Sequence, residues 1–344
     1  MSHSRVLVSG GAGFIGSHLV DELIRGRYQV TVLDDLSNGV MKNLGRHLND
    51  EKLDFVKGDI RDEAVVDKAL QNVEAVIHLA AIVSIPFSVE YPKVTYEVNV
   101  EATRSLLEAS LANNVDKFIY VSSCAVYGEP KYLPIDENHP TDPASPYAES
   151  KLKAEQVCLE FREANDLKVT ILRPFNVFGP RQRKDQYGGV VARFIERLHE
   201  GRPPVIYGDG LQTRDFVYVK DAARAFMLAL NGDGSEGRIF NVATGVPTSI
   251  NHLAKLLMEL FGIEGVEPEY ADAREGDIMH SYADVKQAKV HLGFEPRISL
   301  RDGLLDLISV QAKEANAAMV QKLESHTHEP EEQKLSEKAQ KVKV

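Results

Sequence analysis

The sequence predicts an α/β fold in which helices cover both faces of a doubly wound parallel sheet. Short β-rich segments alternate with longer helical patterns along the first two thirds of the chain, which is typical of βαβ units. Several β-rich segments are almost continuously apolar, as in Val6-Leu7-Val8, and strands buried on both faces require this. A glycine-rich turn at residues 10–16 directly follows the first such segment and opens a helical pattern. We therefore expect a ligand at the carboxyl edge of the sheet, where such turns lie.

The expected elements follow from local periodicity and from the positions of glycine and proline. Strands are predicted at residues 5–9, 29–34, 54–57, 75–78, 117–121 and 168–172. Helices are predicted at residues 14–25, 63–71, 98–113, 147–165, 190–200, 219–230 and 250–261. The later part is interrupted by Gly and Pro, which indicates a smaller second lobe. We expect a main domain of residues 1–174 plus roughly 216–246, a smaller α/β lobe of 175–215 plus roughly 247–312, and a charged tail, 313–344, that is helical or disordered.

Composition narrows the possible partners. The 344 residues carry a net charge of −11, from 40 Lys+Arg against 51 Asp+Glu, which disfavours nucleic acid as a partner. A small anionic ligand would still be possible, but it would need local cations. Cys124 and Cys158 are the two cysteines in the sequence, so a disulfide-stapled fold is excluded and a reducing cytoplasm is expected. Because no apolar run reaches about 18 residues and residues 1–5 leave no room for a secretory leader, we expect neither membrane insertion nor secretion.

The glycine-rich turn predicts a dinucleotide site. Gly10 permits a tight turn, Gly13 lets the backbone approach a pyrophosphate, and Gly16 lets helix and strand pack closely. The pyrophosphate would lie at the helix N-terminus, where free N–H groups favour anions. Asp34 closes the second strand, where a carboxylate binds an adenosine ribose and repels a 2′-phosphate. Because no Arg or Lys follows before Lys42, we expect NAD rather than NADP, and a main domain of the Rossmann type.

Three further residues predict redox chemistry on an alcohol. Tyr147 and Lys151 are four residues apart, which places them on one face of a helix, and Ser123 comes just after the strand at 117–121. Ionising a tyrosine near neutral pH requires its pKa to fall by about 3 units, or about 4 kcal/mol. One cation about 4 Å away supplies about 4 kcal/mol at an effective dielectric constant near 20. We expect Lys151 and an oxidised nicotinamide ring to supply this charge, so that Tyr147 acts as a base and Ser123 holds the same oxygen.

Taken together, these motifs resemble the extended short-chain dehydrogenases, in particular their branch of nucleotide-sugar epimerases and dehydratases. The resemblance covers roughly residues 4 to 310. Besides the motifs above, it is carried by Asp59-Ile60, His78-Leu-Ala-Ala81, Asn99, Ser122-Ser-Cys-Ala-Val-Tyr-Gly128, Leu172-Arg-Pro-Phe-Asn-Val-Phe-Gly-Pro180, Gln212-Thr-Arg-Asp-Phe216 and Arg274-Glu-Gly-Asp277.

The resemblance implies two adjacent ligand sites and no metal. The residues that it implies for NAD are Gly10, Gly13, Phe14, Ile15, Gly16, Asp34, Asn38, Asp59, Ile60, Leu79, Ala80, Asn99, Tyr147, Lys151 and Phe175. The residues that it implies for the nucleoside diphosphate are Asn176, Val190, Tyr207, Arg214, Arg274 and Asp277. Arg214 and Arg274 would then be the local cations that an anion needs. His78 lies in a buried run and is expected to be structural.

The resemblance also implies the reaction. Dehydratases of this family carry Asp-Glu directly after the active-site hydroxyl residue, whereas this chain has Cys124 and Ala125 there. Dehydration is therefore disfavoured, and the expected reaction is 4-epimerisation with NAD regenerated in each turnover. A net NAD-dependent dehydrogenase or reductase, or an NAD-binding protein without catalysis, are the alternatives.

The expected substrate is a UDP-sugar. Ser281 stands where the resemblance places a gatekeeper beside the sugar C2 group, and Ser84 is expected near the sugar. A serine leaves room for an N-acetyl group, so we expect interconversion of UDP-GlcNAc and UDP-GalNAc, with UDP-Glc and UDP-Gal tolerated. A strict UDP-glucose 4-epimerase and a UDP-glucuronate 4-epimerase remain open. Members of the family often form dimers, here through the helices at 98–113 and 147–165.

Overall fold

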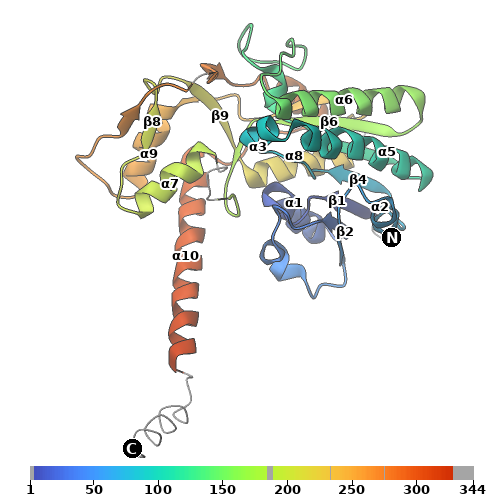
Figure 1. Cartoon of the computed structure of the whole chain (residues 1–344), viewed down its shortest axis with the longest axis horizontal. Coiled ribbons are helices and arrows are strands. Elements are labelled where there is room, and N and C mark those ends of the chain that lie inside the picture. Colours follow the sequence, from blue (N-terminus) through green and yellow to red (C-terminus); the bar gives the residue numbers. More distant parts are fainter. Residues whose placement is uncertain (1–3, 184–188, 233, 275, 328–344) are drawn as a thin grey trace, which may run out of the picture.

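A seven-stranded parallel sheet forms the centre of the molecule (Figure 1). The computed structural model describes residues 4–183, 189–232, 234–274 and 276–327. The strand order is β10-β6-β5-β4-β1-β2-β3. Its strands are β1 (Arg5–Ser9), β2 (Gln29–Asp34), β3 (Leu53–Lys57), β4 (Ala75–His78), β5 (Lys117–Val121), β6 (Lys168–Pro174) and β10 (Ile239–Val242). The direction of winding reverses between β1 and β4, and a crevice for a ligand opens at the carboxyl ends of strands at such a point.

Helices cover both faces of this sheet, which confirms the predicted fold class. The helices of this part are α1 (Phe14–Arg25), α2 (Glu63–Ala69), α3 (Ile85–Glu90), α4 (Pro92–Tyr96), α5 (Ala102–Ala112), α6 (Pro146–Ala164) and α8 (Val219–Asn231). Alternate residues of β1 face opposite layers: Val6 and Val8 pack in one apolar cluster with α1 and α8, and Leu7 packs in another with α5 and α6. Each fully buried aliphatic side chain of this kind contributes about 1.5–3 kcal/mol.

A smaller lobe follows the last strands of the main sheet, on the opposite side of Figure 1 from α5 and α6. Its four-stranded sheet contains β7 (Asn176–Phe178), β9 (Thr213–Tyr218), β11 (Pro247–Ser249) and β13 (His280–Ser281). Strands β8 (Val205–Tyr207) and β12 (Glu269–Ala271) form a separate pair. The helices of this lobe are α7 (Val190–His199), α9 (Ile250–Leu260) and α10 (Leu300–Thr327). Elsewhere in the chain, short helical turns occur at η1 (Met41–His47), η2 (Glu97–Glu101), η3 (Cys124–Tyr127) and η4 (Ala288–Leu292).

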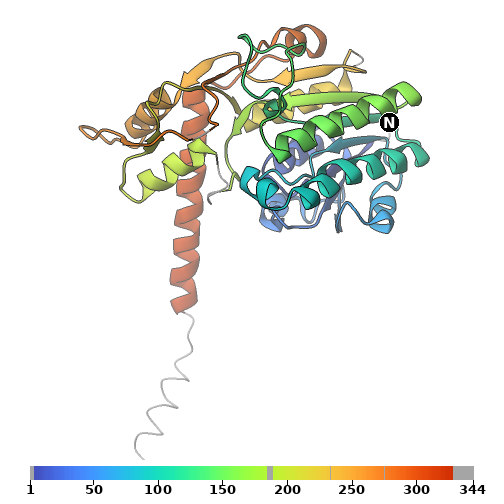
Figure 2. The same cartoon turned by 45° about the horizontal axis from the view of Figure 1, so that its top comes forward.

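The predicted elements are present, with small shifts at their ends. The helix expected at 98–113 begins at Glu97 as the π-helical turn η2, which continues into α5. Helices α3 and α4 were not predicted, because they are only six and five residues long and each has a proline in its first turn. Of the expected tail, residues up to Thr327 belong to α10, which extends away from the rest of the chain (Figure 2), and 328–344 lie outside the described residues. No helix among the described residues has the length and apolar character needed to cross a membrane.

Candidate active site

The turn after β1 has the backbone geometry of a pyrophosphate cradle. Gly10 has a φ of +71°, a left-handed conformation in which its N–H donates to the Leu33 carbonyl at 2.8 Å. A Cβ atom at Gly16 would lie 2.2 Å from the Gly10 carbonyl oxygen, so any larger residue would push α1 away from β1. Gly13 is the N-cap of α1 and has no side chain to bond the first N–H groups of that helix. These donors suit an anion, and the residues of the turn therefore fit the pyrophosphate of NAD.

Asp34 is fixed at the end of β2, beside this turn. Its two carboxylate oxygens accept from the N–H groups of Ala12 and Leu36, each at 2.9 Å. Burial raises the pKa of Asp34, and the two backbone donors oppose that rise. Asn38 lies nearby in sequence, and its Oδ1 accepts from Arg183 at 2.6 Å. This contact joins the segment after β7 to the expected adenosine side of the site, and nothing in the sequence spacing indicated it.

The loop after β4 lies directly against the glycine turn. A Cβ atom on Gly10 would approach the Ala80 nitrogen to 2.8 Å. Asn99, in η2, holds this loop: its Oδ1 accepts from the Ile82 N–H at 2.8 Å, and its Nδ2 donates to the Ile82 carbonyl at 2.9 Å. The same Nδ2 donates to Ser150 Oγ at 2.9 Å. Both amide hydrogens of Asn99 are therefore used within the protein.

The other residues expected at NAD surround the same edge of the sheet. Phe14 and Ile15 begin α1, Asp59 and Ile60 follow β3, Leu79 follows β4, and Phe175 lies between β6 and β7. Arg61 bonds the Asp59 carboxylate at 2.6 Å and lowers its pKa. The structure thus brings these residues together, while their individual contacts with NAD stay predictions.

Tyr147 and Ser123 meet beyond the carboxyl end of β5. Tyr147 is the second residue of α6, and Ser123 is the N-cap of η3, where its Oγ accepts from the Ala125 N–H at 3.1 Å. Burial raises the pKa of Tyr147 to about 12, and a hydrogen bond with Ser123 opposes this rise. The two hydroxyl groups therefore lie within hydrogen-bond distance of each other.

Lys151 lies one turn after Tyr147 on α6, and its ammonium group contacts β5. Its Nζ donates to the Val121 carbonyl at 2.7 Å and lies 4.4 Å from the centre of the Tyr120 ring. Burial lowers the pKa of Lys151 to about 7, which the carboxylate of Glu155 opposes. Burial is the largest influence on the pKa of Tyr147 in this structure, and the joint role of Lys151 and an oxidised nicotinamide ring in lowering that pKa stays a prediction.

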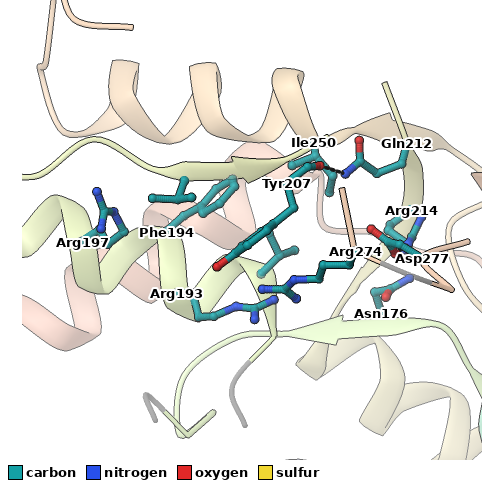
Figure 3. Close-up of a pocket in the computed structure, with 12 residues that line it drawn as sticks. Asn176, Arg193, Phe194, Arg197, Tyr207, Gln212, Arg214, Ile250, Arg274 and Asp277 are labelled. Carbon is teal, nitrogen blue, oxygen red and sulfur yellow. Dashed lines mark hydrogen bonds and ion pairs between the residues drawn. The ribbon is translucent and has the colours of Figure 1, made fainter. Parts of the chain in front are cut away.

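A cavity of about 320 Å³ lies in the smaller lobe, between α7, β8 and β9 (Figure 3). All six residues expected for the nucleoside diphosphate line it: Asn176, Val190, Tyr207, Arg214, Arg274 and Asp277. The remaining lining residues were not predicted, and they are Arg193, Phe194, Arg197, Val205, Gln212 and Ile250. Gln212 lies within a motif quoted for the resemblance, whereas the arginines of α7 resemble the solvent face of an ordinary amphipathic helix.

Four arginines give the cavity its positive character. Arg214 donates to Asp277, and Arg197 donates to Glu269 at 2.7 Å. Arg274 and Arg193 converge beside the Tyr207 ring (Figure 3), and the Arg274 guanidinium lies 3.8 Å from the centre of that ring. The hydrogen bond with Arg274 lowers the pKa of Tyr207, and burial together with Arg274 lowers the pKa of Arg193. A bound anion would relieve the repulsion between these two guanidinium groups.

Cys124 follows Ser123 in the chain and lies near Arg214, which lines the cavity. Burial raises the pKa of its thiol to about 12, and the nearby Arg214 guanidinium opposes this shift. The nearby Cys124 thiol also contributes to the raised pKa of Tyr147. Ser281 is buried on β13 in register with Arg214 of β9. Ser84 caps α3 by accepting from the Phe87 N–H at 3.2 Å, and it does not line the cavity.

His78 has the structural role that the sequence suggested. Its ring is 1% exposed, with Nδ1 2.6 Å from Ser9 Oγ and Nε2 2.9 Å from Thr103 Oγ1. Both nitrogens are thus used in tying β4 to β1 and α5.

Comparisons with known proteins identify the family. The model of the NAD dependent epimerase/dehydratase family matches residues 6–243. The chain is 41% identical to the UDP-glucose 4-epimerase of Mycolicibacterium smegmatis over 302 residues, which is 87% of this chain and 96% of that protein. It superposes with a TM-score of 0.85 on the UDP-glucose 4-epimerase of Thermotoga maritima, crystallised with UDP-glucose, at 40% identity, covering 90% of this chain and 99% of the other.

A second solved structure is the UDP-N-acetylglucosamine 4-epimerase of Methanobrevibacter ruminantium, in complex with UDP-N-acetylmuramic acid. Its TM-score is 0.86 at 39% identity, covering 91% of this chain and 100% of that one. Relatives named dTDP-glucose 4,6-dehydratase match at 32% to 36% identity. The chain belongs to the NAD dependent epimerase/dehydratase family, which confirms the expected Rossmann-type enzyme and its cofactor NAD.

Proposed function

We propose that the protein is a UDP-sugar 4-epimerase that works with bound NAD. The observation that carries the proposal is the arginine-lined cavity, in which Arg214 lies near enough to Cys124, the residue after Ser123, to act on its thiol electrostatically. Guanidinium groups suit the oxygens of a diphosphate, and the hydroxyl pair suits a sugar alcohol. Relatives named for this activity cover almost the whole chain.

The roles of the chain's own residues follow from their places. The glycine turn and Asp34 would hold NAD, which supplies the hydride acceptor and donor that the amino acids lack. Tyr147 would take the proton of the sugar's 4-hydroxyl group and later return it, while Ser123 would hydrogen-bond the same oxygen. Lys151, in its protonated form, would add positive charge one turn after Tyr147 on α6, and the carboxylate of Glu155 favours that form. The arginines would hold the diphosphate while the sugar turns and presents its other face.

Dehydration is the main alternative within the family, and the structure disfavours it at one position. An elimination of water needs an acid and a base next to Ser123, where this chain has Cys124 and Ala125. The thiol of Cys124 is neutral near pH 7, because burial raises its pKa to about 12, and alanine has no titratable group.

The deciding experiment is to incubate the purified protein with a panel of UDP-sugars, without added NAD, and to analyse the products by NMR. Formation of the 4-epimer without accumulation of NADH supports the proposal. A 4-keto-6-deoxy sugar would assign a dehydratase instead, and NADH in amounts equal to the product would assign a net dehydrogenase.

For the sugar itself, we propose UDP-GlcNAc and UDP-GalNAc, with UDP-Glc and UDP-Gal also accepted. Ser281 supports this, because a small side chain beside Arg214 leaves room for an acetamido group. The structure of the UDP-N-acetylglucosamine 4-epimerase, a close fold relative, also supports it. A strict UDP-glucose epimerase and a UDP-glucuronate epimerase are the alternatives.

Substitution of the gatekeeper tests this preference. Ser281→Tyr is expected to lower turnover of UDP-GlcNAc about tenfold or more relative to UDP-Glc, because a bulky ring would fill the acetamido space. His280→Tyr on the same short strand is the control, since that side chain is exposed. An unchanged ratio of the two turnover rates in Ser281→Tyr would remove Ser281 from sugar selection.

We also propose that the enzyme acts as a cytoplasmic homodimer. Both cysteines are free, which suits a reducing compartment. Helices α5 and α6 lie side by side and remain the candidate contact surface (Figure 1). Light scattering of the purified protein would give the mass directly, and a monomer at micromolar concentration would contradict this part.

A further inference from the structure

The first turn of α6 carries Tyr147, and the first N–H groups of a helix find no partner within it. Pro146 has no N–H, and Ala148 N–H donates to its own N-cap, Ser145 Oγ, at 3.2 Å. The N–H of Tyr147 between them donates instead to a residue of another helix, Ser88 of α3, whose Oγ lies 3.1 Å away. The cap of the catalytic helix is therefore completed from outside that helix.

The hydroxyl group of Ser88 is oriented for this bond. Ser88 is 0% exposed, and its single hydroxyl hydrogen is donated to the Ile85 carbonyl at 2.7 Å. Its oxygen lone pairs thus remain for the Tyr147 N–H. The backbone N–H of Ser88 donates to the Ser84 carbonyl at 2.9 Å, so the same residue also anchors the turn that begins at Ser84.

The carbonyl of Tyr147 is tied to the same segment. It accepts from Ser150 Oγ at 2.7 Å, and this hydroxyl accepts from Asn99 Nδ2 at 2.9 Å. Asn99 in turn holds both backbone groups of Ile82. The N–H and the carbonyl of Tyr147 are therefore both connected, through buried side chains, to residues 82–88.

We propose that Ser88 is a positioning residue for Tyr147, which fixes the first turn of α6 against the loop between β4 and α3. The proposal rests on the proposed function, in which Tyr147 is the base for the sugar's hydroxyl group. A helix end that opens and closes would move the phenol by an ångström or more, and proton transfer requires closer alignment than that. Ser88 would act on the reaction rate without touching the substrate.

The test compares Ser88→Ala and Ser88→Cys with Ser110→Ala in the full-length protein. Cysteine fills the space of the hydroxyl but is a poor acceptor, so it separates the hydrogen bond from packing. Ser110 is a matched control: it is 0% exposed on α5, and its Oγ donates to the Leu106 carbonyl at 2.6 Å. The measurements are kcat and KM for the UDP-sugar, the melting temperature, the NAD content, and hydrogen exchange of the Tyr147 amide.

Both Ser88 variants are expected to lower kcat about tenfold and to raise exchange of the Tyr147 amide about tenfold. KM and NAD content should match the wild type, and the melting temperature should match Ser110→Ala, whose kcat should not change. A Ser88→Cys protein with wild-type kcat and wild-type amide exchange overturns the proposal. Amide exchange is independent of the reaction, so it decides about Ser88 even if the wild-type protein proves not to be an epimerase.

Discussion

The two ligand sites of this protein are built in different ways. At the carboxyl edge of the main sheet, binding groups belong mostly to the backbone: a glycine turn between β1 and α1 leaves N–H donors free, and Asp34 adds one carboxylate. In the smaller lobe, the binding groups are long charged side chains that come from α7, β9 and the segment after β12. The first site depends on the absence of side chains and the second on their presence. We therefore expect added side chains to weaken binding at the first site and truncated side chains to weaken binding at the second.

The largest effect is expected at Tyr147, the proposed base. Tyr147→Phe removes only the hydroxyl group and should lower kcat about 10²- to 10⁴-fold, which is the usual size of a general base contribution. Bound NAD, measured after denaturation, should stay near the wild-type amount, because the glycine turn is untouched. A rate within a few fold of the wild type would remove Tyr147 from the mechanism.

In the glycine turn, adding a single methyl group should be enough to weaken the binding of NAD. Gly16→Ala would place a Cβ atom 2.2 Å from the Gly10 carbonyl oxygen, and relieving this clash should weaken NAD binding about 10- to 100-fold. Gly45→Ala is the matched control, because nothing lies within 4 Å of its added Cβ. NAD titration by calorimetry measures both, and equal affinities would show that the tight packing is not needed for the cofactor.

In the cavity, loss of an arginine side chain should weaken the binding of the UDP-sugar. Arg274→Ala should raise KM for the UDP-sugar about tenfold with kcat within about twofold, since one charged hydrogen bond contributes about 1.5 kcal/mol or more. Arg197→Ala should have a smaller effect, because Glu269 and the Pro203 carbonyl already engage that guanidinium. Steady-state kinetics separates the two parameters, and an Arg197→Ala protein impaired more than Arg274→Ala would reverse the assignment.

The smallest effect is expected on the free energy of unfolding at mildly acidic pH. It should arise from two buried histidines, one in helix α1 and one in strand β4 of the main sheet. Burial lowers the pKa of His18 from 6.5 to about 4 and that of His78 to about 3. Between these pKa values and pH 6.5, the two histidines bind more protons in the unfolded chain than in the folded chain. The free energy of unfolding therefore falls as the pH falls.

From pH 7 to pH 6 the two histidines together should cost roughly 1 kcal/mol of stability. Urea unfolding at both pH values gives this difference. His18→Gln, which can still donate to the Pro180 carbonyl, should remove about half of it. Equal stability of the wild type at pH 7 and pH 6 would contradict the buried neutral state of both rings.

This contrast also explains what could be predicted from sequence. The glycine turn and Asp34 could be recognised because their chemistry lies in short local segments with fixed spacing. Arg193 could not, because only the packing of α7 against β8 turns it toward Tyr207 and Arg274. The spacing of Tyr147 and Lys151 correctly predicted that both lie on one helix, but the hydrogen-bond partner of the lysine ammonium is a carbonyl of β5, which helical periodicity does not reveal.

In the proposed reaction, the hydrogen on C4 of the sugar is transferred as hydride to the cofactor and then returned to the same carbon. The most direct test is to run the reaction in D₂O with purified protein and a UDP-sugar, and to examine the 4-epimer by mass spectrometry and NMR. We predict a product that carries no deuterium at any carbon atom, because the hydrogen transferred to and from the cofactor never exchanges with solvent. Deuterium at C4 of the product, or at C5 and C6 of a deoxygenated sugar, would contradict it.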